Sequence, residues 1–153
     1  MSDINRGTFY LHYRDVYDLL EQIEAELMQN FNLTLNRFDS SLLKQHPSRI
    51  FYEVFSLIKE NSDMVEILLG ENGDINFMAG LKNVLRDKCL NDFMEDFRKR
   101  DNAHFDVYYN YIINGCIGIV QYWLQGGLKE SPSELALLTE QIVNEGVKGF
   151  TSK

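Results

Sequence analysis

Residues 105–124 read FDVYYNYIINGCIGIVQYWL and contain no proline, which favours one continuous helix. Their apolar side chains do not keep to one stripe but surround the helix axis, as in a helix that is buried on every side or that crosses a membrane. Polar residues are spread along its whole length and argue against a membrane span: Asp106, Asn110, Asn114 and Gln121. We therefore predict that the same chain covers one side of this helix and that a partner covers the other.

The segment that follows predicts a second helix, antiparallel to the first and joined to it by a turn at Gly126-Gly127. Residues 131–134, Ser-Pro-Ser-Glu, combine an N-cap serine, a first-turn proline and a glutamate three residues on, which is a capping box. This last helix carries two apolar stripes, so two copies of the helix pair are expected to form a homodimer. The predicted dimer interface consists of Ile112, Gly115, Ile119, Trp123, Leu135, Ala136, Val143 and Phe150.

Four further helices are predicted upstream from apolar residues at spacings of three and four. The first covers residues 15 to about 37, and His46-Pro47 starts the second. Ser62-Asp63 caps a short third helix, residues 64–69, and Asp74 opens a fourth that runs to about residue 97. The sequence therefore predicts an all-α fold.

The composition fits one globular domain, with 44% hydrophobic and 25% charged residues in a chain of 153. Both cysteines lie in predicted helices and no signal peptide is visible, so we expect reduced thiols and a cytoplasmic protein. The net charge of −8 argues against binding nucleic acid through bulk electrostatics. The sequence lacks glycine-rich phosphate loops, serine-hydrolase motifs and zinc-binding spacings, so we expect no enzyme activity, no metal and no cofactor.

The N-terminal region carries the motif Asn5-Arg6-Gly7-Thr8-Phe9-Tyr10-Leu11-His12-Tyr13, followed by Asp18-Leu19-Leu20. This order resembles the recognition helix and the start of the connecting helix in TetR-family transcriptional regulators. The segment Tyr122-Trp123-Leu124-Gln125-Gly126-Gly127, together with residues 131–136, is similar to the last two helices of Firmicute-type members of that family. Those members include relatives of the activators of dihydroxyacetone kinase operons.

The resemblance implies a TetR-like C-terminal regulatory helical bundle preceded by a remnant of the helix-turn-helix recognition helix. Residues 1–14 would be that remnant, in a chain truncated within its helix-turn-helix, and residues 15–153 the ligand-binding and dimerisation domain. The implied partners are a second copy of the chain, operator DNA for the intact protein, and a small-molecule or protein effector. The residues expected to contact DNA in the intact protein are Asn5, Arg6, Gly7, Thr8, Tyr10, His12 and Tyr13.

TetR-like regulators place an effector pocket among their central helices. The corresponding candidates here are Phe51, Phe55, Phe77, Met78, Leu81, Tyr108, Tyr111, Ile112 and Cys116. Aromatic and sulfur-containing side chains at helical spacing are also typical of an ordinary core. We interpret the chain as mostly the regulatory domain of an effector-responsive regulator. Two alternatives stay open: a stand-alone dimeric ligand-binding or protein-interaction module without DNA binding, and a structural adaptor without a ligand.

Overall fold

A computed structural model describes residues 16–37, 47–70, 73–88, 99 and 102–151, of which 47, 102 and 146–151 are described by their backbone alone. All regular secondary structure in these residues is helical, which confirms the predicted all-α fold. The helices are α2 (Val16–Asn36), α4 (Pro47–Glu60), α5 (Ser62–Leu69), α6 (Ile75–Lys88), α8 (Asn102–Gln125) and α9 (Pro132–Thr151). None of the helices in the described part is long and apolar enough to cross a membrane.

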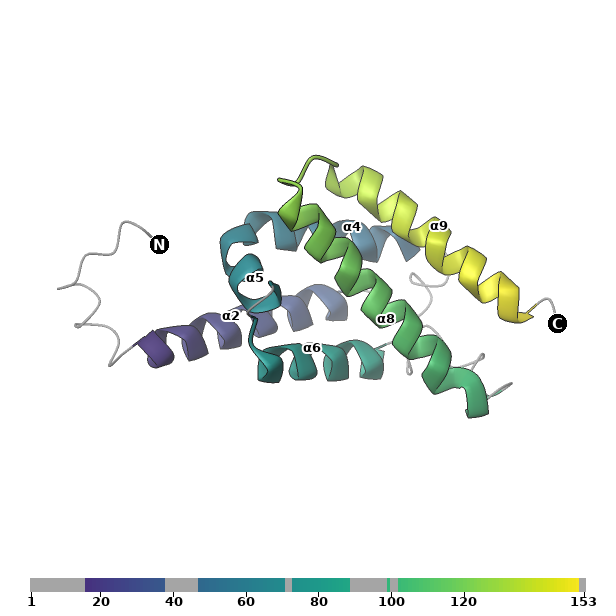
Figure 1. Ribbon diagram of the computed structural model, residues 1–153, viewed down its shortest axis with the longest axis horizontal. Helices are drawn as coiled ribbons and strands as arrows, with labels where there is room; N and C mark the ends of the chain where they lie inside the picture. The colour runs from purple at the N-terminus through teal and green to yellow at the C-terminus, as the bar shows by residue number, and fades with distance from the viewer. Residues whose placement is uncertain (1–15, 38–46, 71–72, 89–98, 100–101, 152–153) are drawn as a thin grey trace.

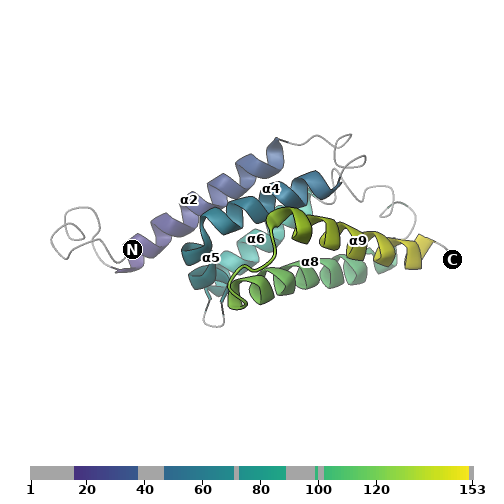
Figure 2. The ribbon, with the colours of Figure 1, turned by 90° about the horizontal axis from the view of Figure 1, so that it is seen from above.

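The helices form a bundle in which α8 and α9 run antiparallel as a hairpin (Figure 1). Helix α4 packs most extensively against α9, and α2 packs against both α4 and α6. Helices α5 and α6 in turn contact α8. Seen from above, α4 lies between α2 and α9 (Figure 2). Helices α2, α4, α6 and α8 therefore surround the interior of the bundle.

Local side-chain chemistry fixes the start of two helices, as the sequence predicts. The Ser131 hydroxyl accepts a hydrogen bond from the Glu134 backbone N–H at 3.1 Å, and the Glu134 carboxylate accepts one from the Ser131 N–H at 3.4 Å. This reciprocal pair is the predicted capping box at α9. At α6, Asp74 Oδ1 accepts hydrogen bonds from the N–H groups of Asn76 (2.8 Å) and Phe77 (3.1 Å), which confirms the predicted cap.

The predicted cap of the short helix α5 is wrong. The helix begins at Ser62 itself, immediately after α4, and Asn61 occupies the N-cap position without a side-chain capping bond. The Asn61 amide instead donates to the Leu57 carbonyl oxygen of α4 at 2.9 Å. Helix α6 ends at Lys88 in the described residues, and the predicted continuation over 89–97 lies outside them.

The interior contains two clusters of buried apolar side chains. The larger joins α2, α4, α5 and α6 to the α8–α9 hairpin and includes Leu68, Trp123 and Ala136, each 1% exposed. The smaller lies along α8 and centres on Phe105 and Tyr108, each 2% exposed. Met78 and Leu85 of α6 are packed against both clusters, so α6 is where the two cores meet.

The turn between α8 and α9 is held by Trp123. Its indole Nε1–H donates to the Glu130 carbonyl oxygen at 2.9 Å, and its own carbonyl accepts the Leu128 N–H at 2.9 Å. Gly127 (φ 82°) and Leu128 (φ 58°) adopt left-handed backbone conformations in this turn. Glycine takes that conformation without steric cost, which explains why the sequence places a glycine at position 127.

Candidate functional site

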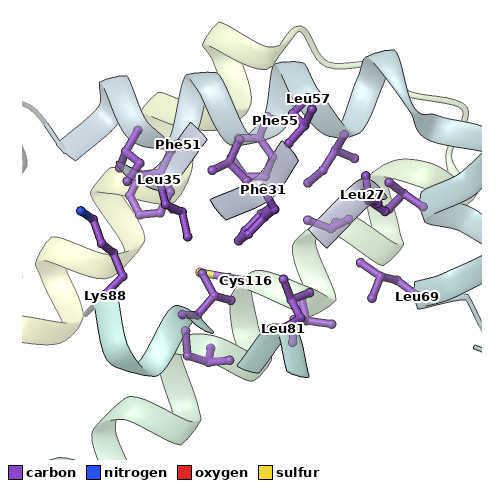
Figure 3. A pocket seen from close by; sticks show the side chains of 18 of the residues that line it. Leu27, Phe31, Leu35, Phe51, Phe55, Leu57, Leu69, Leu81, Lys88 and Cys116 are labelled. Carbon is purple, nitrogen blue, oxygen red and sulfur yellow. The ribbon is translucent and has the colours of Figure 1, made fainter. Parts of the chain in front are cut away.

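A cavity of about 170 Å³ lies between α2, α4, α6 and α8. Its wall contains members of both core clusters, so it separates them. Figure 3 shows most of the side chains that line it, converging from several helices. The lining residues are Leu27, Phe31, Leu35, Ile50, Phe51, Val54, Phe55, Leu57, Ile58, Val65, Leu69, Phe77, Leu81, Leu85, Lys88, Ile112, Ile113, Cys116, Ile117, Val120 and Val143.

Six of the nine predicted pocket residues line this cavity: Phe51, Phe55, Phe77, Leu81, Ile112 and Cys116. The other three do not. Met78 is half-buried between the two core clusters, and Tyr108 is buried with its hydroxyl 3.4 Å from the Val143 carbonyl oxygen. Tyr111 is 69% exposed, because its position on α8 points away from the bundle. The prediction was wrong for Tyr111, since sequence alone does not show which side of an apolar helix faces inward.

Helix α2 contributes three lining residues that the sequence analysis did not single out, Leu27, Phe31 and Leu35. These residues occupy one stripe of α2 at spacings of four, and all three are buried. The apolar stripe of α2 was visible in the sequence, but nothing in it distinguished a cavity wall from ordinary core. A molecule in this cavity would touch α2 directly.

Lys88, the last residue of α6, was also missed. It is the only charged side chain among the described residues that line the cavity. Figure 3 shows Lys88 at one end, on the side of Phe51 and Leu35, whereas Leu27 and Leu69 lie at the other end. A lysine in the last turn of a helix is ordinarily a solvated residue that interacts favourably with the helix dipole, so its position in the sequence does not mark it as a pocket residue.

The thiol of Cys116 faces this apolar interior. Burial raises the pKa of the Cys116 thiol to about 11, because the thiolate would lose its hydration there. The thiol is therefore neutral at physiological pH and acts as a small polarisable contact, not as a nucleophile.

Polar contacts clamp α6 onto α8 beside the cavity. The Tyr109 hydroxyl donates to the Lys82 carbonyl oxygen at 2.8 Å. The Arg86 guanidinium lies 5.4 Å from the centre of the Tyr109 ring and 2.6 Å from the Asp106 carboxylate. Because the side chains of Arg86 and Asp106 are 39% and 62% exposed, water screens their ion pair, which sets geometry more than it adds stability.

A pair of acidic groups joins α2 to the start of α6. Glu24 is half-buried, and burial, with a hydrogen bond to Asp74 and repulsion from Asp74 and Glu21, raises the pKa of Glu24 to about 7. The same hydrogen bond, together with the backbone N–H groups that Asp74 caps, lowers the pKa of Asp74. The pair therefore shares a proton near neutral pH. Among the described residues, the buried Glu24 Oε1 atom has no hydrogen-bond partner.

The outward side of α8 carries a second feature, an apolar face that the described residues leave exposed. Val107, Tyr111 and Tyr122 are 66%, 69% and 71% exposed. Between them, Gly115 and Gly118 are exposed, and a side chain added at either glycine would meet open space. We call these five residues, with Leu138 (50% exposed) and Ile142 (46% exposed) of the antiparallel helix α9, the hairpin face.

The structure corrects much of the predicted dimer interface. Four of its residues are buried in the core of the chain itself and cannot form an external surface: Trp123, Leu135, Ala136 and Val143. Gly115 belongs to the hairpin face, whereas Ile112 and Ile119 are only half-exposed. Phe150 lies in the part of α9 whose side chains are not described. The hairpin was predicted correctly, but four of the eight residues chosen on it point inward.

The residues predicted to contact DNA, Asn5 to Tyr13, lie outside the described residues. In the part of the chain that is described, no three His, Cys, Asp or Glu side chains come together as a metal site would require. The candidate functional sites among the described residues are therefore the apolar cavity and the hairpin face.

Comparison with known protein families identifies the family to which this helical chain belongs. The family model for the C-terminal region of TetR transcriptional regulators matches residues 45–145, which is most of the chain. The chain belongs to the TetR family of transcriptional regulators. This family regulates transcription and is not a family of enzymes. No curated protein and no solved structure matches the chain.

Proposed function

We propose that this TetR-family protein is a homodimeric, effector-responsive DNA-binding regulator in which the hairpin face forms the dimer interface. The observation that carries the proposal is the exposure of that face. Three large apolar side chains on α8 are at least 66% exposed, on the same side as two exposed glycines. A row of exposed apolar side chains along one helix, on an otherwise acidic protein, indicates an interaction site.

A second copy of the chain is the partner that this face fits best. A two-fold axis needs only one self-complementary surface, and an antiparallel helix pair meeting its own copy makes a four-helix bundle. Gly115 and Gly118 allow the backbones of two α8 helices to approach closely, because no side chain stands between them. Family members are usually dimeric and bind DNA, which agrees with this arrangement.

The cavity supports the effector-responsive part of the proposal. Leu27, Phe31 and Leu35 place α2 in the cavity wall, and α2 begins just after the segment that resembles a DNA-reading helix. A molecule that enters the cavity makes contacts that depend on the position of α2, so it favours one position over another. In the dimer, the position of α2 sets the spacing of the two DNA-reading segments and thereby the fit to successive major grooves.

Finer assignments follow from the sequence resemblance. The sequence of the C-terminal hairpin supports assigning the chain to the Firmicute-type members of the TetR family, near the activators of dihydroxyacetone kinase operons. Residues 1–14 then belong to the DNA-binding unit and residues 15–153 to the regulatory domain, and a regulator of this type acts in the cytoplasm, where its operator is. The effector is a small molecule or a protein.

The dimer is tested by placing a charge on the hairpin face. Ile142→Asp forces an unpaired carboxylate into the proposed interface, at a cost of roughly several kcal/mol, and should yield monomers in sedimentation velocity at micromolar concentration. Ile75→Asp is the matched control, because Ile75 is 84% exposed at the start of α6, away from the face. A monomeric wild-type chain, or an Ile142→Asp dimer as stable as the control, contradicts the proposed interface.

The net charge of −8 favours a second candidate, a dimeric ligand-binding or interaction module that does not bind DNA. Selection of random duplex DNA by the complete gene product separates the two. Enrichment of a two-fold symmetric sequence supports the regulator, whereas a dimer that enriches no sequence supports the module.

A further inference from the structure

The chemistry of the cavity wall restricts what the cavity can bind. Among its described lining residues, only Lys88 and Cys116 carry a side-chain atom other than carbon and hydrogen. A buried hydroxyl, amide or sugar on a ligand would find almost no hydrogen-bond partner there and would lose several kcal/mol of hydration, roughly 2–7. The main body of the ligand must therefore be hydrocarbon.

The charge at one end of the cavity restricts the rest of the ligand. Lys88 is half-buried, and because the cavity surface is wholly apolar, it lines the cavity with its aliphatic stem while its ammonium group lies at the rim. Lys88 also interacts within the protein, but an ammonium group has three N–H donors and can serve a further acceptor. A single positive charge beside a low-dielectric cavity attracts one negative charge and repels a cation.

We propose that the cavity binds an amphiphilic monocarboxylate, with its hydrocarbon part among α2, α4, α6 and α8 and its carboxylate at Lys88. The inference rests on the proposed role of the cavity as the effector site and specifies the class of effector. A cavity of similar volume, about 150 Å³, holds a benzene-sized molecule, so a hydrocarbon part of about six to eight carbons suits this one. A nucleotide or a coenzyme thioester is too polar and too large for it.

The binding can be followed with the protein's own fluorophore. Trp123 is the only tryptophan of the chain, and its ring packs edge-on against Phe55 at a centroid distance of 5.7 Å. Because Phe55 lines the cavity, a ligand that displaces it changes the surroundings of the indole. Octanoate, 1-octanol and octylamine have the same chain length and carry a negative, no and a positive charge, so titration with each separates the apolar from the ionic contribution.

We expect wild-type protein to bind octanoate about tenfold more tightly than 1-octanol, and octylamine more weakly than either. Lys88→Met keeps most of the apolar stem but removes the charge, and should bring octanoate and octanol to within about twofold of each other. Lys82→Met is the matched control, because Lys82 lies on the same helix but outside the cavity wall, and should leave the tenfold preference unchanged. Calorimetric titration of the same samples measures binding independently of the indole.

Equal affinity for octanoate and octanol in the wild type overturns the carboxylate assignment, and so does a preference that survives Lys88→Met. Absence of binding by all three probes in the calorimeter overturns the inference as a whole. Sedimentation of the same samples keeps the two proposals apart. A dimer that binds no octanoate contradicts only the inference, whereas a monomer contradicts the proposed function whichever probe binds.

Discussion

Replacing Phe55 with alanine removes a ring that is 3% exposed, lines the cavity and contacts both Trp123 and Phe51. A phenylalanine side chain buries roughly 150–250 Å². At about 25 cal/mol per Å², this burial contributes roughly 4–6 kcal/mol, part of which the alanine methyl retains. Large-to-small changes of this kind cost about 3–5 kcal/mol. We expect the lower end, about 3 kcal/mol, because the adjoining cavity already leaves one side of the ring without close contacts.

The assay is urea unfolding of wild type and variant at one protein concentration, because the stability of a dimer depends on concentration. Tyr52→Ala is the control. Tyr52 lies one turn away from Phe55 on α4 and is 43% exposed, so its loss should change the free energy of unfolding by about 0.5 kcal/mol or less. Similar costs for the two variants would refute the placement of the Phe55 side of α4 against the cavity.

Three further changes test separate parts of the structure. Because the folded state raises the pKa of Glu24 to about 7, the stabilisation from its proton is complete below about pH 4.5 and is lost as the pH rises through 7. The free energy of unfolding, measured in urea, should therefore decline between about pH 5 and about pH 8, and Glu24→Gln should flatten this decline. An unchanged decline would show that the carboxyl pair does not control it. Ser131→Ala removes the hydroxyl that caps α9 and should lower the free energy of unfolding by about 1 kcal/mol. An unchanged free energy of unfolding would show that the capping hydrogen bond is absent in solution. Thr139 is fully buried, and its hydroxyl has no hydrogen-bond partner among the described residues, so Thr139→Val should keep or raise the melting temperature; a marked decrease would reveal a partner.

The features predicted correctly from the sequence are those fixed by neighbours along the chain. The capping box of Ser131 and Glu134 and the cap at Asp74 depend on contacts within three residues, so the sequence shows both partners at once. The cap of α5 was mispredicted because Asn61 is shared between two consecutive helices, and its amide bonds to the preceding one. Local rules do not decide between two neighbouring helices that compete for one residue.

The orientation of α8 about its axis could not be predicted, and most errors in the site follow from it. A one-sided amphipathic helix reveals its inner face, but α8 is apolar on every side, so Tyr111 could be assigned inward and Trp123 outward with equal reason. Packing against α5 and α6 decides the question in the fold. Lys88 was missed for a related reason, because its role depends on where the end of α6 lies relative to α2 and α4.

Cross-linking at the centre of the hairpin face tests the proposed dimer most directly. Gly118→Cys, in a chain whose natural Cys89 and Cys116 are replaced by serine and alanine, places one thiol on the exposed side of α8, where an added side chain meets open space. We predict that a short bis-maleimide joins most of the protein into covalent dimers at micromolar concentration, whereas Ile75→Cys in the same background stays mostly uncoupled. Little cross-linking at position 118, or as much at position 75, would contradict a dimer built on the hairpin face.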